Sequence, residues 1–219
     1  MSAAGCCMSQ MIDEPLERLR AAARRTRELA LNRAGTGLGH QDAADAADDV
    51  GTIGTDDALG FDPFPLLEAL HHNGVRVVVI GQVAGIMHGS TELTGDLDLL
   101  WDGAPAHAPA LAAAFTSVNA QLIDEKGNPV PTRPDSFLRP KVQFTSPGAS
   151  GDCCTPALPW GNLRVREFLD RAITAVDPGG LEVHYVSRKD LIQMRRAIGR
   201  PKDLRRADEL DSFAPDRRG

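Results

Sequence analysis

The sequence predicts an α/β protein, on the basis of two observations. Short runs rich in β-branched residues, such as 76–80, alternate with segments whose apolar residues recur at helical spacing, such as 105–123. Turn-forming residues separate these segments, as in the Asp-Pro-Gly-Gly sequence at 177–180. With 219 residues, 42% of them hydrophobic, the chain is long enough for one domain with a proper core and additional terminal segments.

The terminal segments differ in composition from the rest of the chain. We expect an N-terminal extension over 1–60, a folded domain over 61–213 and a short tail over 214–219. In the extension, Asp13 and Pro15 predict the start of a basic helix at about 13–33, and the aspartate-rich stretch 35–60 predicts an acidic flexible linker. The arginines of this helix indicate either a contact surface for RNA or a partner, or an ordinary solvated helix face.

The folded domain contains several further elements that follow from periodicity and turn signals. We expect strands at 76–80, 97–101, 141–145, 173–176 and 181–186, and a turn followed by a strand within 148–155. We expect helices at 63–74, 82–88, 105–123, 165–171, 187–199 and 201–213, and a proline-rich loop at 127–140. Ser187 and Asp190 have the spacing of a helix-capping box, and Gly199 suits the end of that helix.

Composition and charge argue against several classes of protein. The net charge of −6 argues against a protein that coats nucleic acid through bulk charge, although a local basic patch remains compatible with it. The four cysteines form two adjacent pairs without zinc or redox spacing, which predicts free thiols in a reducing cytoplasm. No apolar run approaches the ~20 residues of a membrane span, and no signal peptide is recognisable. We therefore expect a cytoplasmic protein without a membrane partner.

Paired aspartates are the most informative feature of the chain. Asp96 and Asp98 are two residues apart at the start of an expected strand, so their side chains share one face. Two carboxylates at ~4 Å repel by about 4 kcal/mol at an effective dielectric constant of about 20, and a divalent cation relieves that repulsion. Asp152 opens a later strand and is a candidate third ligand. The alternatives are strand-edge carboxylates that meet arginines and, for Asp152, a turn residue beside Gly151.

Two further features suit the binding of a phosphorylated substrate. A strand that runs into Gly81 and then into a helix can offer backbone N–H groups to a phosphate. The dinucleotide fingerprint GxGxxG is missing, since Val83 and Ile86 occupy two of its glycine positions. A basic block at 188–206 follows the acidic strands, and it is either a phosphate clamp or a solvated helix face. Acids, turn and basic block together favour metal-assisted nucleotidyl transfer.

Several motifs resemble the nucleotidyltransferase superfamily, in particular the minimal nucleotidyltransferases of the AbiEii and MenT-like toxin group. The motifs are the Gly81 turn, HG at 88–89, TGDLD at 94–98 and LIQMRRAIGRPKDLRRADEL at 191–210. The resemblance covers about 61–212. It implies a polymerase-β-like nucleotidyltransferase fold with a small mixed sheet flanked by helices. It also implies transfer of NMP from NTP with Mg²⁺, or Mn²⁺, as cofactor. In toxin members the acceptor is the 3′ end of tRNA, which implies tRNA and a cognate antitoxin as partners.

The resemblance also implies roles for individual residues. The metal ligands and catalytic acids would be Asp96, Asp98 and Asp152, with Asp152 as the base. The nucleotide-binding residues would be Gly81, Gln82, Arg195, Arg200 and Lys202. The chain departs from the family pattern at two of these positions, where Gln82 replaces Ser or Gly and Arg195 replaces Lys. Two other functions stay open: an adenylyltransferase that acts on a protein or a small molecule, and a non-catalytic relative that binds RNA or a partner.

Overall fold

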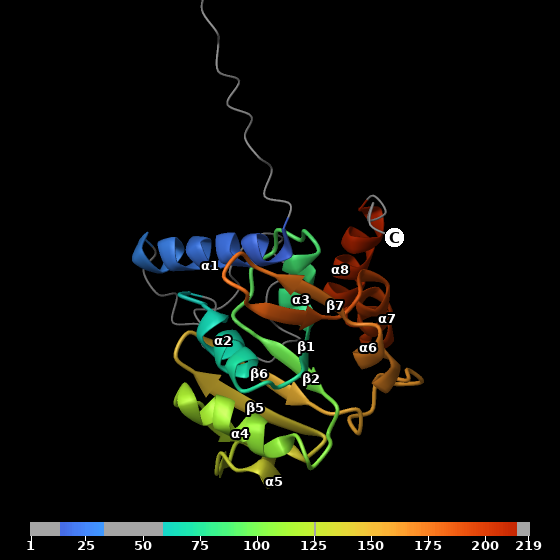
Figure 1. The fold of residues 1–219 in the computed structure, drawn as a ribbon. Helices are drawn as coiled ribbons and strands as arrows, with labels where there is room; N and C mark the ends of the chain where they lie inside the picture. Colours follow the sequence, from blue (N-terminus) through green and yellow to red (C-terminus); the bar gives the residue numbers. More distant parts are fainter. Residues whose placement is uncertain (1–13, 33–58, 125, 214–219) are drawn as a thin grey trace, which may run out of the picture.

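The computed structural model describes residues 14–32, 59–124 and 126–213, which form a mixed eight-stranded sheet flanked by helices (Figure 1). The expected α/β class with a mixed sheet is therefore confirmed. The tail at 214–219 and nearly all of the acidic segment at 35–60 lie outside the described residues.

The sheet has the strand order β4-β3-β5-β6-β2-β1-β8-β7. Its strands are β1 (Val77–Ile80), β2 (Asp98–Trp101), β3 (Gln121–Ile123), β4 (Pro129–Val130), β5 (Lys141–Ser146), β6 (Ala149–Cys154), β7 (Ile173–Val176) and β8 (Glu182–Tyr185). The β1–β8 and β2–β6 pairs are parallel, and the other pairs are antiparallel. All four residues of β1 are buried, which explains why this strand is a continuous apolar run.

The helices form two groups around the sheet. They are α1 (Pro15–Asn32), α2 (Phe64–His72), α3 (Gly81–Met87), α4 (Ala108–Ser117), α5 (Pro134–Phe137), α6 (Arg166–Asp170), α7 (Arg188–Ile198) and α8 (Pro201–Ser212). In one group α2 packs on α4 and α4 on α5; in the other α1 packs on α3, α3 on α7 and α7 on α8 (Figure 1). Among the described residues, no helix is long and apolar enough to cross a membrane.

The N-terminal helix α1 packs against the folded body. Leu16 and Leu19 are almost fully buried in the same core as the sheet. The Arg20 guanidinium pairs with the Asp177 carboxylate at 2.5 Å, and Thr26 Oγ1 donates a hydrogen bond to the carbonyl of Phe61 at 2.9 Å. The helix expected at about 13–33 is therefore present, and it is an integral layer of the fold.

The segment 105–140 contains two errors of the sequence-based prediction. The helix expected at 105–123 ends at Ser117, because Asn119 adopts a left-handed conformation with φ 56°. The following residues form β3, which pairs with β4 and β5 instead of continuing the helix. The loop expected at 127–140 contains β4 and the short helix α5. The first error arises because pairing with β4 and β5 overrides the helical spacing of the apolar residues in β3.

The C-terminal helices begin and end where the sequence predicts. Ser187 Oγ accepts a hydrogen bond from the backbone N–H of Asp190 at 3.2 Å, which confirms the expected cap of α7. Gly199 ends α7 in a left-handed conformation with φ 73°. The chain then turns directly into α8, so the two helices pack side by side next to α3 (Figure 1).

Candidate functional site

Three strands bring the candidate acids together. Ile80 at the end of β1 is paired with Asp98 at the start of β2. The β2–β6 register pairs Leu99 with Cys153, so Asp98 lies beside Asp152. Asp96 forms a parallel bridge with Ser150, which extends the same pairing to the residues just before β2. The structure thus places Asp96, Asp98 and Asp152 at one end of the central strands, where α3 begins.

The Gly81 turn is in direct contact with Asp98. Gly81 adopts a left-handed conformation with φ 66°, and a Cβ atom placed on it would lie 2.2 Å from Asp98 Oδ2. A larger residue is therefore disfavoured at this position both by its conformation and by the carboxylate that fills the space. The glycine is needed here so that the Asp98 carboxylate can lie against the turn.

The electrostatic environment of Asp98 disfavours the ionised form of its carboxyl group. Burial, followed by the negative charges of Asp96 and Asp152, raises the pKa of Asp98 to about 7. A hydrogen bond from the backbone N–H of Asp152 and the charge of Lys141 act in the opposite direction on this pKa. Asp98 is therefore an unfavourable anion in the protein alone, and a bound cation would favour its ionised form.

The donor set fits a divalent ion held by two carboxylates. Mg²⁺ prefers oxygen ligands and is commonly bound by one or two carboxylates together with substrate phosphates and water. Among the described residues, no three His, Cys, Asp or Glu side chains are arranged as a ready-made metal-binding group. The Asp152 carboxylate is instead paired with Lys141 Nζ at 3.3 Å. An ion bound by Asp152 would therefore compete with Lys141 for this carboxylate, and Asp96 and Asp98 stay candidate ligands beside it.

Two lysines interact electrostatically with the acids. Lys141 on β5 is not among the residues expected from the sequence. The side-chain alternation of β5 and its pairing with β6 place Lys141 on the same face of the sheet as Asp152. Lys202 at the start of α8 is half-buried; burial and the nearby charges of Arg200 and Arg206 lower its pKa, while the charge of Asp96 raises it. Both ammonium groups therefore lie within electrostatic reach of the acidic cluster.

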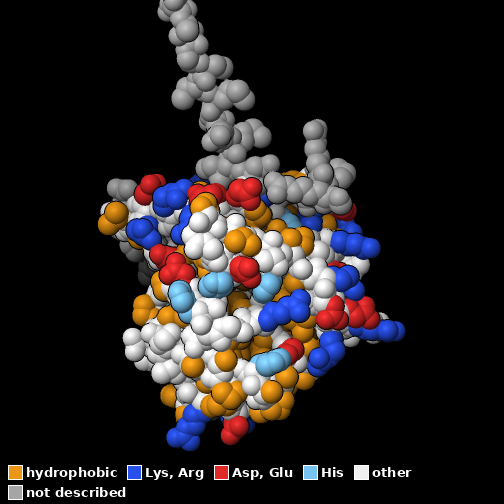
Figure 2. Space-filling model, in the orientation of Figure 1, with side chains coloured by type: hydrophobic (Ala, Val, Ile, Leu, Met, Phe, Trp, Pro, Cys, Tyr) orange, Lys and Arg blue, Asp and Glu red, His pale blue; other side chains and the backbone are white. Residues whose placement is uncertain are grey.

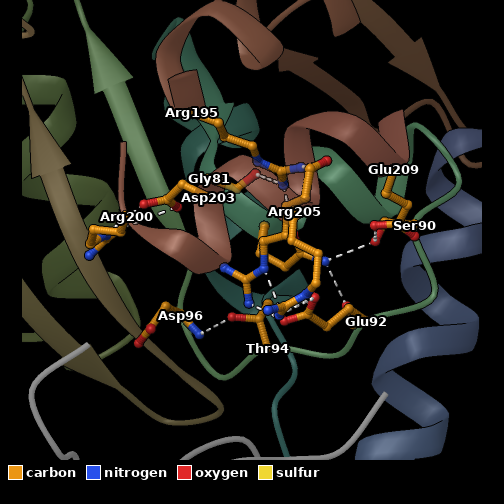
Figure 3. Close-up of polar contacts among 12 residues, drawn as sticks. Gly81, Ser90, Glu92, Thr94, Asp96, Arg195, Arg200, Asp203, Arg205 and Glu209 are labelled. Carbon is orange, nitrogen blue, oxygen red and sulfur yellow. Dashed lines mark hydrogen bonds and ion pairs between the residues drawn. The ribbon is translucent and has the colours of Figure 1, made fainter. Parts of the chain in front are cut away.

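Gln82 and Arg195 contact each other. Arg195 Nη2 donates a hydrogen bond of 2.6 Å to Gln82 Oε1, and both side chains are buried. The Arg195 guanidinium reaches the turn from α7 (Figure 3). Burial is the main reason that the pKa of Arg195 is lowered to about 10. As placed, these two side chains support the turn from within the protein and do not face a ligand on its outside.

The remaining basic residues of α7 and α8 are mostly engaged with acids. Arg200 Nε lies 2.5 Å from Asp203 Oδ2 within the first turn of α8 (Figure 3). Arg196 pairs with Asp208 and Asp211, and Arg206 pairs with Glu92. Figure 2 likewise shows basic side chains with acidic neighbours on the visible face. The basic block therefore supplies structural ion pairs, and Lys202 is a member whose pKa is affected by the charge of Asp96.

Comparison of the chain with protein-family models finds no match, and comparison with curated proteins finds none either. Any assignment of function therefore depends on the residues of the site and their geometry.

Proposed function

We propose that this protein is a Mg²⁺-dependent nucleotidyltransferase that transfers NMP from NTP to an acceptor hydroxyl. The observation that carries the proposal is the contact between the Asp98 carboxylate and the Gly81 turn, with the charges of Asp96 and Asp152 beside it. A turn without a side chain next to a carboxylate pair is suited to a metal-bound polyphosphate. The motifs at 81–98 and 191–210, which resemble the AbiEii and MenT-like nucleotidyltransferases, support the same assignment.

The three acids have different roles in the proposed reaction. Asp96 and Asp98 would hold Mg²⁺ or Mn²⁺, and the ion would polarise the phosphoryl oxygens and offset their charge. Asp152 accepts the proton of the acceptor hydroxyl, whose oxygen forms a bond to the α-phosphorus as the bond to the β-phosphate oxygen breaks. Pyrophosphate leaves with the electrons of the broken bond. Lys141 and Lys202 are placed to stabilise the negative charge of the phosphates.

The position of Gln82 supports an active enzyme over a non-catalytic relative. A glutamine in place of the small residue after Gly81 would obstruct the turn if its side chain pointed outward. Its amide instead points toward Arg195, so the outer side of the turn is left to the Gly81 backbone. The two departures from the family pattern therefore compensate for each other.

The acceptor that the resemblance favours is the 3′ end of tRNA, and the physiological role would then be that of a cytoplasmic toxin with a cognate antitoxin. An adenylyltransferase acting on a protein or small molecule uses the same acids and differs only in the acceptor. The molecule that carries the transferred nucleotide distinguishes the tRNA-modifying enzyme from the adenylyltransferase.

The test is incubation of the purified protein with each α-³²P-labelled NTP, Mg²⁺, total tRNA and a cell lysate. We expect label in the tRNA fraction, lost in Asp98→Asn and retained in the exposed control Asp208→Asn. Label in the protein or small-molecule fraction would favour the adenylyltransferase. Absence of transfer by the wild type, or transfer that survives Asp98→Asn, would refute the proposed function.

A further inference from the structure

A buried chain of polar contacts lies behind the Gly81 turn (Figure 3). Its centre is the pair formed by Gln82 and Arg195, whose residues are only 5% and 4% exposed. Arg195 Nη2 donates to Gln82 Oε1 at 2.6 Å and lies 3.5 Å from the carbonyl oxygen of Gly81. The guanidinium therefore binds both the side chain and the backbone of the turn that contacts Asp98.

The amide nitrogen of Gln82 binds the segment of the chain that leads to Asp96. Gln82 Nε2 donates to Ser90 Oγ at 3.1 Å and to the Glu92 carbonyl at 2.8 Å. The backbone N–H of Asp96 in turn donates to Thr94 Oγ1 at 3.1 Å (Figure 3). Gln82 thus links α7, through Arg195, to the segment between α3 and β2.

Helix α8 completes the arrangement. Ser90 Oγ donates to Glu209 Oε2 at 2.9 Å, and Arg195 Nη1 donates to the carbonyl oxygen of Arg206 at 2.9 Å. The Arg206 guanidinium pairs with the Glu92 carboxylate. Helices α7 and α8 therefore hold the turn before Asp98 and the connection before Asp96 at the same time.

We propose that Gln82 and Arg195 act as one positioning unit that fixes the Gly81 turn and the 88–97 connection relative to each other, and so holds Asp96 and Asp98 as a metal-binding pair. The metal-binding consequence rests on the proposed function; the positioning itself does not. The Asp98 carboxylate fills the space above Gly81, so a shift of the turn must move the carboxylate. Neither residue touches the substrate in this account.

The close fit of Arg195 against α3 agrees with this role. A Cβ atom placed on Gly85 would lie 2.6 Å from Arg195 Nη2. The guanidinium therefore occupies a space that exists only because position 85 lacks a side chain. This fit and the two hydrogen bonds to 81–82 place the guanidinium reproducibly against the first turn of α3.

The experiment is a double-mutant cycle with Gln82→Met, Arg195→Met and the double variant. Each variant is measured by urea unfolding, by amide hydrogen exchange of the segment 81–98, and by electron paramagnetic resonance of bound Mn²⁺. Arg196→Met is the matched control, because Arg196 is the next residue of α7 and its ion pairs among the described residues are with exposed acids on α8.

We expect each single variant to be destabilised, because it leaves a buried polar partner unsatisfied, and the double variant to recover part of the lost stability. All three variants should nevertheless show faster exchange in 81–98 and Mn²⁺ affinity lower by about 10–100-fold, as is usual when residues that orient metal ligands are changed. Gln82→Glu retains the acceptor for Arg195 but removes the Nε2 donor. It should therefore raise exchange at 90–96 more than at 81–82.

Two results would overturn the proposal. One is unchanged exchange in 81–98 in all three variants. The other is a double variant whose exchange and Mn²⁺ affinity return to wild type together with its stability, since that is the behaviour of residues that only pack. If the wild type binds no Mn²⁺ while the variants show the expected faster exchange in 81–98, the proposed function is refuted and the positioning role is supported.

Discussion

Lys141 Nζ lies 3.3 Å from Asp152 Oδ2, and this ion pair places a positive charge of the chain beside the acidic cluster. Lys141 also opposes the rise in the pKa of Asp98. Both partners are partly exposed, with side-chain exposures of 25% and 30%, so the pair contributes about 1 kcal/mol or less. Lys141 therefore compensates only a fraction of the repulsion among the three acids.

Lys141→Met should lower the melting temperature in EDTA, by no more than about 2–4 °C, because the acids lose their adjacent cation. Mn²⁺ should raise the melting temperature of this variant more than that of the wild type, since the ion supplies the missing positive charge. Lys189→Met, at an exposed position on α7, is the control and should match the wild type. Equal responses of Lys141→Met and the wild type to Mn²⁺ would contradict the prediction.

Gly81→Ala and Gly74→Ala separate backbone conformation from the contact with Asp98. The two glycines have nearly the same φ, 66° and 64°, but only Gly81 has a neighbour where Cβ would lie. We expect Gly74→Ala to cost about 1–2 kcal/mol and Gly81→Ala about 2–4 kcal/mol of unfolding free energy. Urea unfolding measures both, and Asp98→Ala in the Gly81→Ala background should recover part of the loss. Equal costs at the two glycines would show that the Asp98 contact is unimportant.

Asp98 should make stability depend on pH in the absence of metal. Its pKa is 3.8 in the reference state and about 7 in the folded protein, so the folded state binds more protons between these values. The free energy of unfolding should therefore fall as pH rises from about 4 to about 7, and then level off. Asp98→Asn removes this dependence, so in EDTA it should exceed the wild type in stability at pH 8 and lose the advantage toward pH 4. Parallel pH profiles of the two proteins would contradict this prediction.

The burial of α1 can be tested with two leucines of the same helix. Leu19 is 0% exposed and Leu31 is 82% exposed. Leu19→Ala should cost about 2–5 kcal/mol of unfolding free energy, because it leaves a cavity between α1 and the core, whereas Leu31→Ala should change it little. Urea unfolding of both variants is the measurement. A negligible effect of Leu19→Ala would mean that α1 is a dispensable arm.

Local signals account for the parts of the fold that the sequence predicted well. The capping box at Ser187, the glycine at 199 and the β-branched run of β1 each act over a few neighbouring residues, and each element was found. The strand β3 was predicted as helix because its apolar residues continue the helical spacing of α4. The left-handed Asn119 and the pairing with β5 decide otherwise, and neither is readable from periodicity.

Strand patterns in the sequence predict the three acids of the candidate site, but they do not predict its contacts between residues distant in sequence. The shared face of Asp96 and Asp98 follows from strand alternation, and the approach of Asp152 follows once β6 is placed beside β2. The contact between Gln82 and Arg195 joins residues 113 positions apart, so no local pattern could reveal it. The same holds for Lys141, whose significance depends on the pairing of β5 with β6.

The central claim is that Asp96 and Asp98 hold the divalent ion of a nucleotidyltransferase. The most direct measurement is electron paramagnetic resonance of Mn²⁺ titrated into the wild type, Asp98→Asn and Asp208→Asn in the presence of a non-hydrolysable NTP analogue. We expect binding by the wild type and by Asp208→Asn, and affinity lower by at least about tenfold in Asp98→Asn. Failure of the wild type to bind Mn²⁺, or equal affinity in Asp98→Asn, would contradict it.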